Sequence, residues 1–444
     1  MSKKRNTNPN KFWMRLSHPL RWLVPGLGVK RWILLILFGT TLLGVGLAVL
    51  LLEVYRTAPD TWWLPILSIA SLRVLSRPLR VLIFGGLGTG LILVGIWGIN
   101  RSLLAPYRRP GKPMLDELTD HRRKERGPRI VTIGGGHGLS TLLRGLKNYS
   151  YNITAVVTVA DDGGSSGRIR QAQGIPPPGD IRNCLAALSS DEALMTQLFQ
   201  YRFSDGNPEL DGHPFGNLFI SALSEITGSF EEAVVESGRV LAVHGRVLPA
   251  TLHNVRLVAD MQLPHSDGEV RIEGESIFPK FPGNVQRVWL EPSNPTAYPQ
   301  VIQAILASEL LVIGPGSLFT SVLPNLLVPD IVAAIQASRA LKIYVCNVAT
   351  QPGETEGYSC EDHIKVLTDH VGGAIFDLIV INNQFEGKLP PGTDWVKTIP
   401  ENESEYPLYR ADLVDQDQPW RHDSTKLAKA IINLYQERTG PLVE

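Results

Sequence analysis

Residues Arg129–Asp180 read RIVTIGGGHGLSTLLRGLKNYSYNITAVVTVADDGGSSGRIRQAQGIPPPGD. The apolar run Ile130–Ile133 ends in four glycines around one histidine, and a segment with apolar residues at helical spacing follows. A second apolar run, Ile153–Ala160, ends in an acidic, glycine-rich turn. This order of strand, glycine turn, helix, strand and acidic turn predicts the beginning of a parallel α/β sheet.

The first glycine turn predicts a loop that binds phosphate. Its residues are Gly134, Gly135, Gly136, His137 and Gly138, and Ser140 stands where the N-cap of the following helix is expected. Glycines let a ligand approach the backbone, and a helix start offers free N–H groups to an anion. The spacing fits neither G-x-G-x-x-G nor a Walker A motif. A turn that only reverses the chain is the alternative, but the second glycine turn beside it favours a ligand cleft.

The composition of the whole chain excludes some classes of function. The formal net charge of the 444 residues is zero, so no general basic field favours nucleic acid as a partner. The three cysteines, Cys184, Cys346 and Cys360, have no metal-binding spacing and are interpreted as reduced core thiols. Mean hydropathy is +0.01, which is high for a soluble protein, and the excess of apolar residues lies in the first quarter of the chain.

That first quarter, residues 1–105, predicts a membrane hairpin. Trp32–Leu52 and Val81–Ile99 are uncharged apolar runs that are long enough to cross a bilayer as helices. Lysines and arginines cluster before the first run and after the second, which places both ends in the cytoplasm. We therefore expect a protein of the inner (plasma) membrane with its soluble domain in the cytoplasm. A charged linker at residues 106–128 would lead into that domain, residues 129–444.

From Arg129 onward, strand-like and helix-like segments alternate, which predicts a Rossmann-like, mostly parallel α/β sheet. Short alternating segments within Gly245–Leu290 predict an antiparallel β excursion. Polar or small residues follow nearly every predicted parallel strand, at the sheet edge where ligands bind in such folds. Those that we select as candidate ligand-binding residues are Asp161, Asp162, Ser165 and Ser166 after the second strand, then Gly314, Gly316, Ser317, Asn347 and Gln351 after later ones.

Two further motifs supply polar groups to the predicted cleft. The run PPPGDIRN places Asp180 at a helix N-cap, with Arg182 and Asn183 in the first turn. The run HPFGN begins another helix near Asn217, which serves either as a cap or as a ligand-binding residue. Capping alone explains Asp180, but it does not explain why a rigid proline run presents an arginine and an asparagine together.

These motifs resemble the YvcK family, whose members are called gluconeogenesis factors and which is related to the 2-phospho-L-lactate transferases (CofD). The similar runs are GGGHGLSTLLRGLK, TVADDGGSSGRIR, PPPGDIRN, GHPFGNL, VIGPGSLFTSVLPNLLVP and YVCNVATQPGETEGY. The resemblance covers the soluble part and not the first quarter. It implies a Rossmann-like fold that binds a nucleotide or nucleotide sugar, and a role in cell shape and wall synthesis during growth on gluconeogenic carbon. At His137 this chain departs from the small hydroxyl residue expected in many relatives.

Three hypotheses about function follow. In a ligand-sensing regulator, the glycine loop and Ser140 hold the diphosphate of a UDP-sugar, Gly314–Ser317 closes the other side, and Asn347, Asn217 or Asn183 reads the sugar or base. In a transferase, Asp161 or Asp162 holds Mg²⁺ and Arg182 neutralises charge in the transition state. In a dinucleotide oxidoreductase, one of these aspartates binds a ribose hydroxyl. We favour the regulator, with Asp162 as the candidate metal ligand and a homo-oligomer as the expected assembly.

Overall fold

The computed structural model of the chain describes residues 114–190, 192–203, 210–263, 268–281, 283–398 and 405–440, together with isolated positions between 37 and 93. The predicted membrane spans lie outside the described residues, apart from such isolated positions. The chain divides into two compact units, Met1–Arg122 and Arg123–Glu444. The second half of the expected linker forms helix α5 (Met114–Glu125).

Among the described residues, no single helix has the length and apolar composition needed to cross a membrane. Two short segments, Leu318–Leu326 and Pro329–Ala337, reach that composition only when taken together, and they are bent by 73° relative to each other. Both contribute buried side chains to the core of the second unit.

The second unit is built on a seven-stranded sheet in the order β10-β9-β8-β7-β1-β2-β3, in which every pairing is parallel. Its apolar strands are buried on both faces, as expected of a parallel sheet covered by helices. The strands are β1 (Ile130–Gly134), β2 (Ile153–Val157), β3 (Arg246–Pro249), β7 (Leu310–Ile313), β8 (Leu341–Val345), β9 (Leu378–Asn382) and β10 (Leu408–Ala411). The predicted parallel α/β class is therefore confirmed.

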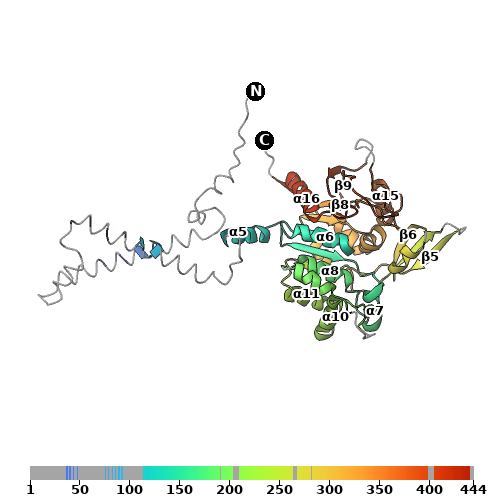
Figure 1. Ribbon diagram of the computed structural model, residues 1–444, viewed down its shortest axis with the longest axis horizontal. Helices are drawn as coiled ribbons and strands as arrows, with labels where there is room; N and C mark the ends of the chain where they lie inside the picture. The colour runs from blue at the N-terminus through green and yellow to red at the C-terminus, as the bar shows by residue number, and fades with distance from the viewer. Residues whose placement is uncertain are drawn as a thin grey trace, which may run out of the picture. The chain divides into compact units, whose positions relative to one another are not determined.

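Two hydrophobic clusters cover the two faces of this sheet. One face carries α6 (Gly136–Leu146), α8 (Gly179–Leu188), α9 (Glu192–Gln200), α10 (Phe215–Thr227), α11 (Phe230–Val240) and α16 (Ser424–Thr439). The other carries α12 (Pro299–Ala307), the π-helical turn η4 (Leu318–Val322), α13 (Leu323–Leu326), α14 (Pro329–Ala337) and α15 (Cys360–Val371). Figure 1 shows α8, α10 and α11 grouped beside α6.

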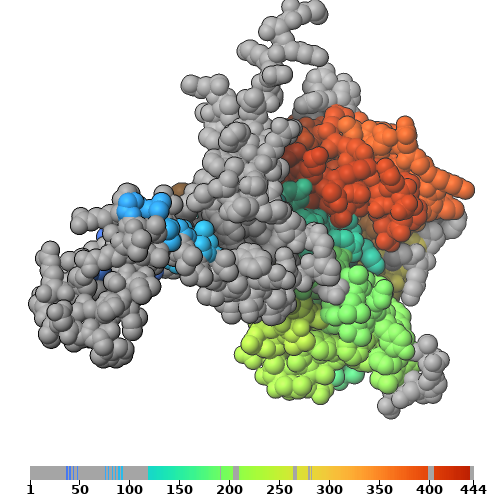
Figure 2. Space-filling view, turned by 60° about the vertical axis from the view of Figure 1, so that its left-hand side comes forward, coloured from blue at the N-terminus to red at the C-terminus, as the bar shows by residue number. Residues whose placement is uncertain are grey.

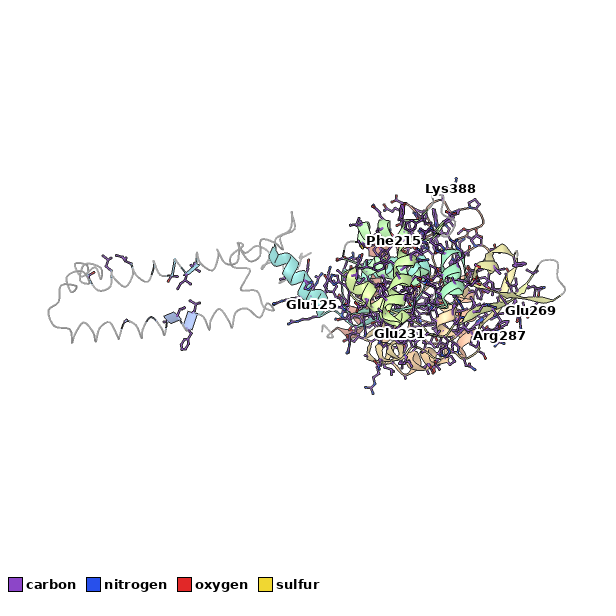
Figure 3. The ribbon with its side chains drawn as sticks, turned by 90° about the horizontal axis from the view of Figure 1, so that it is seen from below. Glu125, Phe215, Glu231, Glu269, Arg287 and Lys388 are labelled. Atoms are coloured by element: carbon purple, nitrogen blue, oxygen red, sulfur yellow. The ribbon has the colours of Figure 1, made fainter. Side chains whose placement is uncertain are left out.

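A small antiparallel sheet, in the order β5-β4-β6, follows the first half of the parallel sheet. Its strands are β4 (Arg256–Gln262), β5 (Glu269–Glu273) and β6 (Asn284–Glu291), and the 3₁₀ helix η3 (Glu275–Lys280) connects two of them. This confirms the antiparallel excursion predicted within Gly245–Leu290, except at the beginning of that range, where β3 pairs in parallel with β2. The sheet projects at one end of the unit, where Figure 3 labels Glu269 and Arg287.

The strand order changes direction between β1 and β7. From β1 the chain proceeds to β2 and β3 on one side, whereas β7 to β10 extend on the other. The loops after β1 and β7 therefore leave the sheet in opposite directions and open a crevice at its carboxyl edge. In Figure 2 the teal surface, from the beginning of the unit, lies between the green and the orange-red surfaces.

Two predicted N-cap positions, Ser140 and Asp180, are wrong, and of the two roles considered for Asn217 the structure excludes the cap. Helix α6 begins at Gly136 with Gly135 as its N-cap, so Ser140 lies inside the helix, where its hydroxyl donates to the Gly136 carbonyl at 3.0 Å. Helix α8 begins at Gly179, which leaves Asp180 in its first turn rather than at its N-cap. Asn217 likewise lies inside α10. In each case the helix begins earlier than predicted, because it includes glycines that the sequence pattern assigned to the preceding loop.

Candidate functional site

A cavity of about 380 Å³ lies at the carboxyl ends of β1, β7 and β8. This is the point at which the strand order changes direction, where ligands bind in open α/β sheets. Eight of the predicted residues line the cavity: Gly135, Gly136, His137, Gly138, Gly316, Ser317, Asn347 and Gln351. The sequence reasoning missed Thr141, Pro315, Ser321, Val348, Ala349, Thr350, Pro352, Thr393, Trp420, Arg421 and His422.

The first wall is the glycine loop after β1. Gly136 has φ +62°, a left-handed conformation that favours glycine, and it begins α6. A Cβ atom on Gly138 would lie 2.6 Å from the Pro315 carbonyl oxygen, so only glycine lets the two loops meet. Because α6 begins at the cavity wall, its positive dipole end faces the cavity and favours an anion there.

The second wall is the turn after β7, which Asn347 and Glu354 hold in place. Asn347 Nδ2 donates to the Gly316 carbonyl at 2.9 Å, and the Gly316 amide donates to Asn347 Oδ1 at 3.4 Å. The Ser317 hydroxyl donates to Glu354 Oε2 at 2.5 Å. Two residues that were expected to contact a ligand, Asn347 and Ser317, therefore also fix the shape of the cavity.

The third wall comes from the segment before α16. Trp420 lines the cavity with 37% of its surface exposed, and the exposed Arg421 lies beside it. His422 Nε2 lies 3.2 Å from the Cys346 carbonyl oxygen. Burial lowers the pKa of His422 to about 4, so its imidazole is neutral at pH 7 and donates to that carbonyl. No local sequence signal marked this wall, because it reaches the cavity only through the fold.

Three arginines act electrostatically on His137 in the cavity wall. Burial lowers the pKa of His137, and the positive charges of Arg421, Arg182 and Arg144 lower this pKa further, in that order. His137 is therefore neutral at pH 7, while the surrounding guanidinium groups stay charged. A neutral imidazole beside cations and a helix N-terminus suits an anionic group such as a phosphate.

The other predicted residues gather behind the glycine loop, where α7 (Gly164–Gln173), α8 and α10 begin. Asp180 Oδ2 accepts a hydrogen bond from the Gly136 amide at 2.8 Å, which ties α8 to the start of α6. Asn217 Nδ2 donates to the Ser165 hydroxyl at 3.0 Å. The residues of this second group are Asp161, Ser165, Ser166, Asp180, Arg182, Asn183 and Asn217, and none of them lines the cavity.

Gly134 and Gly314 end their strands next to the cavity without lining it. The Gly134 carbonyl accepts from Asn325 Nδ2 at 3.0 Å, and the Gly314 amide donates to the Ile133 carbonyl at 2.8 Å. The Gly134 carbonyl also accepts from the Thr158 amide at 3.1 Å, so both residues continue the backbone hydrogen bonds of the sheet into the loops. Their contribution to the site is the position of the loops.

The candidate metal ligand Asp162 is engaged within the protein. Its Oδ1 accepts from the Ser276 amide at 3.0 Å, at the start of η3. Its carboxylate also occupies the space that a Cβ atom on Gly274 would need. No group of three or more His, Cys, Asp or Glu residues in the described part of the chain has the geometry to hold a metal ion. Asp162 as a metal ligand therefore stays a prediction, and its Oδ1 is bonded to the chain itself.

Comparison with known proteins places this fold and cavity in a family. The family described as 2-phospho-L-lactate transferase CofD matches residues 130–439, and the chain belongs to it. A relative from Nostoc sp. is 45% identical over 95% of this chain and 93% of its own length. The gluconeogenesis factor of Bacillus subtilis is 45% identical over 70% of this chain and 99% of its own. Within the CofD family, the chain is thus a member of the gluconeogenesis-factor (YvcK) group, as the sequence motifs predicted.

A crystal structure supports the fold of the second unit. The structure of a UPF0052 family protein from Bacillus halodurans superposes with a TM-score of 0.63 at 41% identity. It covers 69% of this chain and 99% of its own. The relatives from both Bacillus species therefore match a region about as long as the second unit alone.

Proposed function

We propose that the cavity binds a nucleotide sugar of the UDP-sugar type, and that the protein is a ligand-sensing regulator of gluconeogenic growth and cell shape. The observation that carries this proposal is the meeting of a helix N-terminus, a neutral histidine and Arg421 around one cavity of about 380 Å³. That volume is within the range of small-molecule sites. The membership of the gluconeogenesis-factor group supports the same role.

The walls of the cavity suggest how such a ligand binds. The diphosphate lies against the first turn of α6 and accepts hydrogen bonds from the Arg421 guanidinium. The indole of Trp420 offers an apolar face on which a uracil ring can stack. Gln351 and Thr350 supply amide and hydroxyl groups for the sugar.

Ligand binding to the purified full chain tests this proposal. We expect UDP-glucose and UDP-N-acetylglucosamine to raise the melting temperature, and UMP or glucose alone to have much smaller effects. Arg421→Gln removes a charged hydrogen bond and is expected to weaken binding about tenfold or more. The matched control is Arg287→Gln on the antiparallel sheet, labelled in Figure 3, which should bind as the unaltered chain does.

Two results would contradict the regulator. If no UDP-sugar at millimolar concentration raises the melting temperature, the proposal that the cavity binds a UDP-sugar is contradicted. Release of a nucleoside monophosphate from a phospholactyl nucleotide supports the transferase instead.

In cells, a chromosomal Arg421→Gln change is expected to impair growth on gluconeogenic carbon sources and to leave growth on glucose unchanged.

A further inference from the structure

The helix starts behind the glycine loop meet at one place. An added Cβ atom on Gly179, in α8, would lie 2.4 Å from the Ser166 hydroxyl of α7. One on Gly216, in α10, would lie 2.7 Å from the side-chain carbons of Arg182. None of α7, α8 and α10 has a side-chain hydrogen bond from its N-cap residue. Figure 1 labels the three helices, and Figure 3 labels Phe215 at the start of α10. The starts of three helices thus meet at one place. At the start of α7, Asp161 Oδ1 accepts from the Gly163 amide at 2.8 Å.

Two buried side chains at this place have unused hydrogen-bonding groups. Arg182 is 8% exposed, and its Nε–H group has no partner among the described residues. Its Nη2 donates to Asn183 Oδ1 at 3.0 Å. Asn217 is 1% exposed, and its Oδ1 has no partner within the described chain either, although its Nδ2 is bonded to Ser165. Buried polar atoms in folded proteins are almost always satisfied, so these two indicate a missing partner.

The charge balance indicates the sign of that partner. Burial lowers the pKa of Arg182 to about 10, and the positive charge of Arg202 adds to this effect. The charges of the Asp180 and Asp161 carboxylates raise this pKa in turn, but among the described residues neither carboxylate forms a hydrogen bond or an ion pair with Arg182. Arg182 therefore stays charged at neutral pH in a buried place. A buried cation is costly unless an anion in contact compensates it.

We propose that Arg182 and Asn217 form a second binding site, separate from the cavity, for a phosphate-type oxyanion. The oxygens of the anion accept from Arg182 Nε–H and from first-turn amides of α7 and α8. A P–OH group donates to Asn217 Oδ1, which a fully deprotonated anion cannot do. The positive charge of Arg182 acts on His137, which lines the cavity. An anion bound to Arg182 therefore also changes the electrostatic potential at His137. This site does not depend on the UDP-sugar proposal.

The test measures thermal unfolding of the purified full chain in orthophosphate and in chloride at equal ionic strength. We expect a saturable rise in melting temperature with orthophosphate, and a smaller rise with sulfate, which lacks a hydroxyl at neutral pH. Arg182→Lys keeps the charge but loses the Nε–H group, and should weaken phosphate binding about tenfold. Asn217→Asp changes the side chain little in shape and should also weaken binding, because it adds a negative charge.

Arg421→Gln separates this site from the cavity, since it removes a cavity cation and leaves Arg182 in place. Loss of the phosphate effect in Arg421→Gln, together with its retention in Asn217→Asp, would place the anion in the cavity and overturn the proposal. Should Arg182→Lys fail to fold, Asn217→Asp decides alone. Glycerol 1-phosphate, compared with orthophosphate, distinguishes the phosphoryl group of an organic ligand from the free ion. Stabilisation by neither compound would exclude the site.

Crystals grown with arsenate give an independent measurement. Arsenate has the shape and the hydroxyl of phosphate, and its arsenic atom is located by anomalous scattering. We expect an anomalous peak within hydrogen-bonding distance of Arg182 Nε. A peak at the glycine loop of α6 alone would contradict the second site.

Discussion

At the scale of single residues, the glycines of the loop after β1 have different roles. An added Cβ atom on Gly138 would lie 2.6 Å from the Pro315 oxygen and 2.9 Å from the Gly316 Cα atom, both in backbone. On Gly134 the nearest atom would be at 3.7 Å, which is ordinary contact. The sequence shows these glycines as one run, and only their surroundings distinguish them.

We therefore predict that Gly138→Ala lowers the free energy of unfolding by about 1–3 kcal/mol, as overpacking does, and weakens ligand binding. Gly134→Ala in the same loop is the matched control and should change stability by less than about 0.5 kcal/mol. Chemical denaturation of the two variants measures both effects. Equal stability of the two variants would show that the loops after β1 and β7 do not meet as described.

Asp180 gives a prediction about pH. Burial and, after it, the Asp161 charge raise the pKa of this carboxyl to about 6, against the opposing Gly136 hydrogen bond and Arg182 charge. Between pH 4 and 6 the native state thus keeps a proton that the unfolded state has lost. The contribution of Asp180 to the free energy of unfolding therefore falls as pH rises through this interval, and is constant above it.

Asp180→Asn removes this titration and can keep the hydrogen bond from Gly136. We expect the stability of the variant relative to the unaltered chain to increase from pH 4 to pH 6.5, by on the order of 2 kcal/mol. Thermal unfolding over that range measures the difference. A difference that does not change with pH would mean that Asp180 titrates normally in the folded protein.

At the scale of elements, the packing of α6 against α16 depends on Gly145. A Cβ atom there would lie 2.0 Å from the Ser424 carbonyl oxygen and 2.6 Å from the Ala428 Cβ atom. Gly238 also lies in a helix, α11, but its nearest neighbours would be at 3.8 Å. Helix propensity alone treats the two positions alike and favours alanine at both.

The structure predicts opposite outcomes at these positions. Gly145→Ala should destabilise the protein by about 1–3 kcal/mol, because α16 must move away from α6. Gly238→Ala should stabilise it by roughly 0.5–1 kcal/mol, because alanine is the better helix former. Urea denaturation of the two variants checks both signs. Stabilisation by Gly145→Ala would refute the close approach of the two helices.

At the scale of the whole molecule, we propose that residues 1–105 anchor the chain in the inner membrane as a hairpin. The full chain is then expected in the membrane fraction after carbonate washing, and the compact unit Arg123–Glu444 in the soluble fraction. Relatives that match a region about as long as this unit indicate that it folds on its own.

Labelling of intact cells tests the topology. Asp60→Cys, in the loop between the predicted spans, should react with a membrane-impermeant maleimide. His121→Cys, an exposed position after the second span, should react only after lysis, because the positive-inside rule places it in the cytoplasm. Reaction of both cysteines, or of neither, in intact cells would contradict a hairpin.

Much of the architecture could be predicted from local patterns. The strand Leu310–Ile313 has the predicted bounds, and the parallel class and the antiparallel excursion follow from apolar periodicity. Two four-residue strands of the parallel sheet, β3 and β10, were missed, because such short segments carry little apolar signal. Half of the cavity could be predicted too, because the glycine turns and Asn347 are recognisable by their residue types at strand ends. The wall formed by Trp420, Arg421 and His422 could not, since nothing local indicates which distant loop they approach.

The sequence by itself determined the order of strands and helices, the glycine loop at the start of α6 and the family, because periodicity and motifs are local properties of the chain. Only the tertiary structure decided which of the candidate polar residues line the cavity and which gather at the helix starts behind it. Strand order puts Gly316 and Asn347 around the cavity, whereas the meeting of three helix starts puts Arg182 and Asn217 behind it. The physical reason is that strand pairing and close helix contacts join residues that lie far apart in the sequence, by 31 positions for Gly316 and Asn347 and by 52 for Ser165 and Asn217, so no single stretch of sequence encodes them.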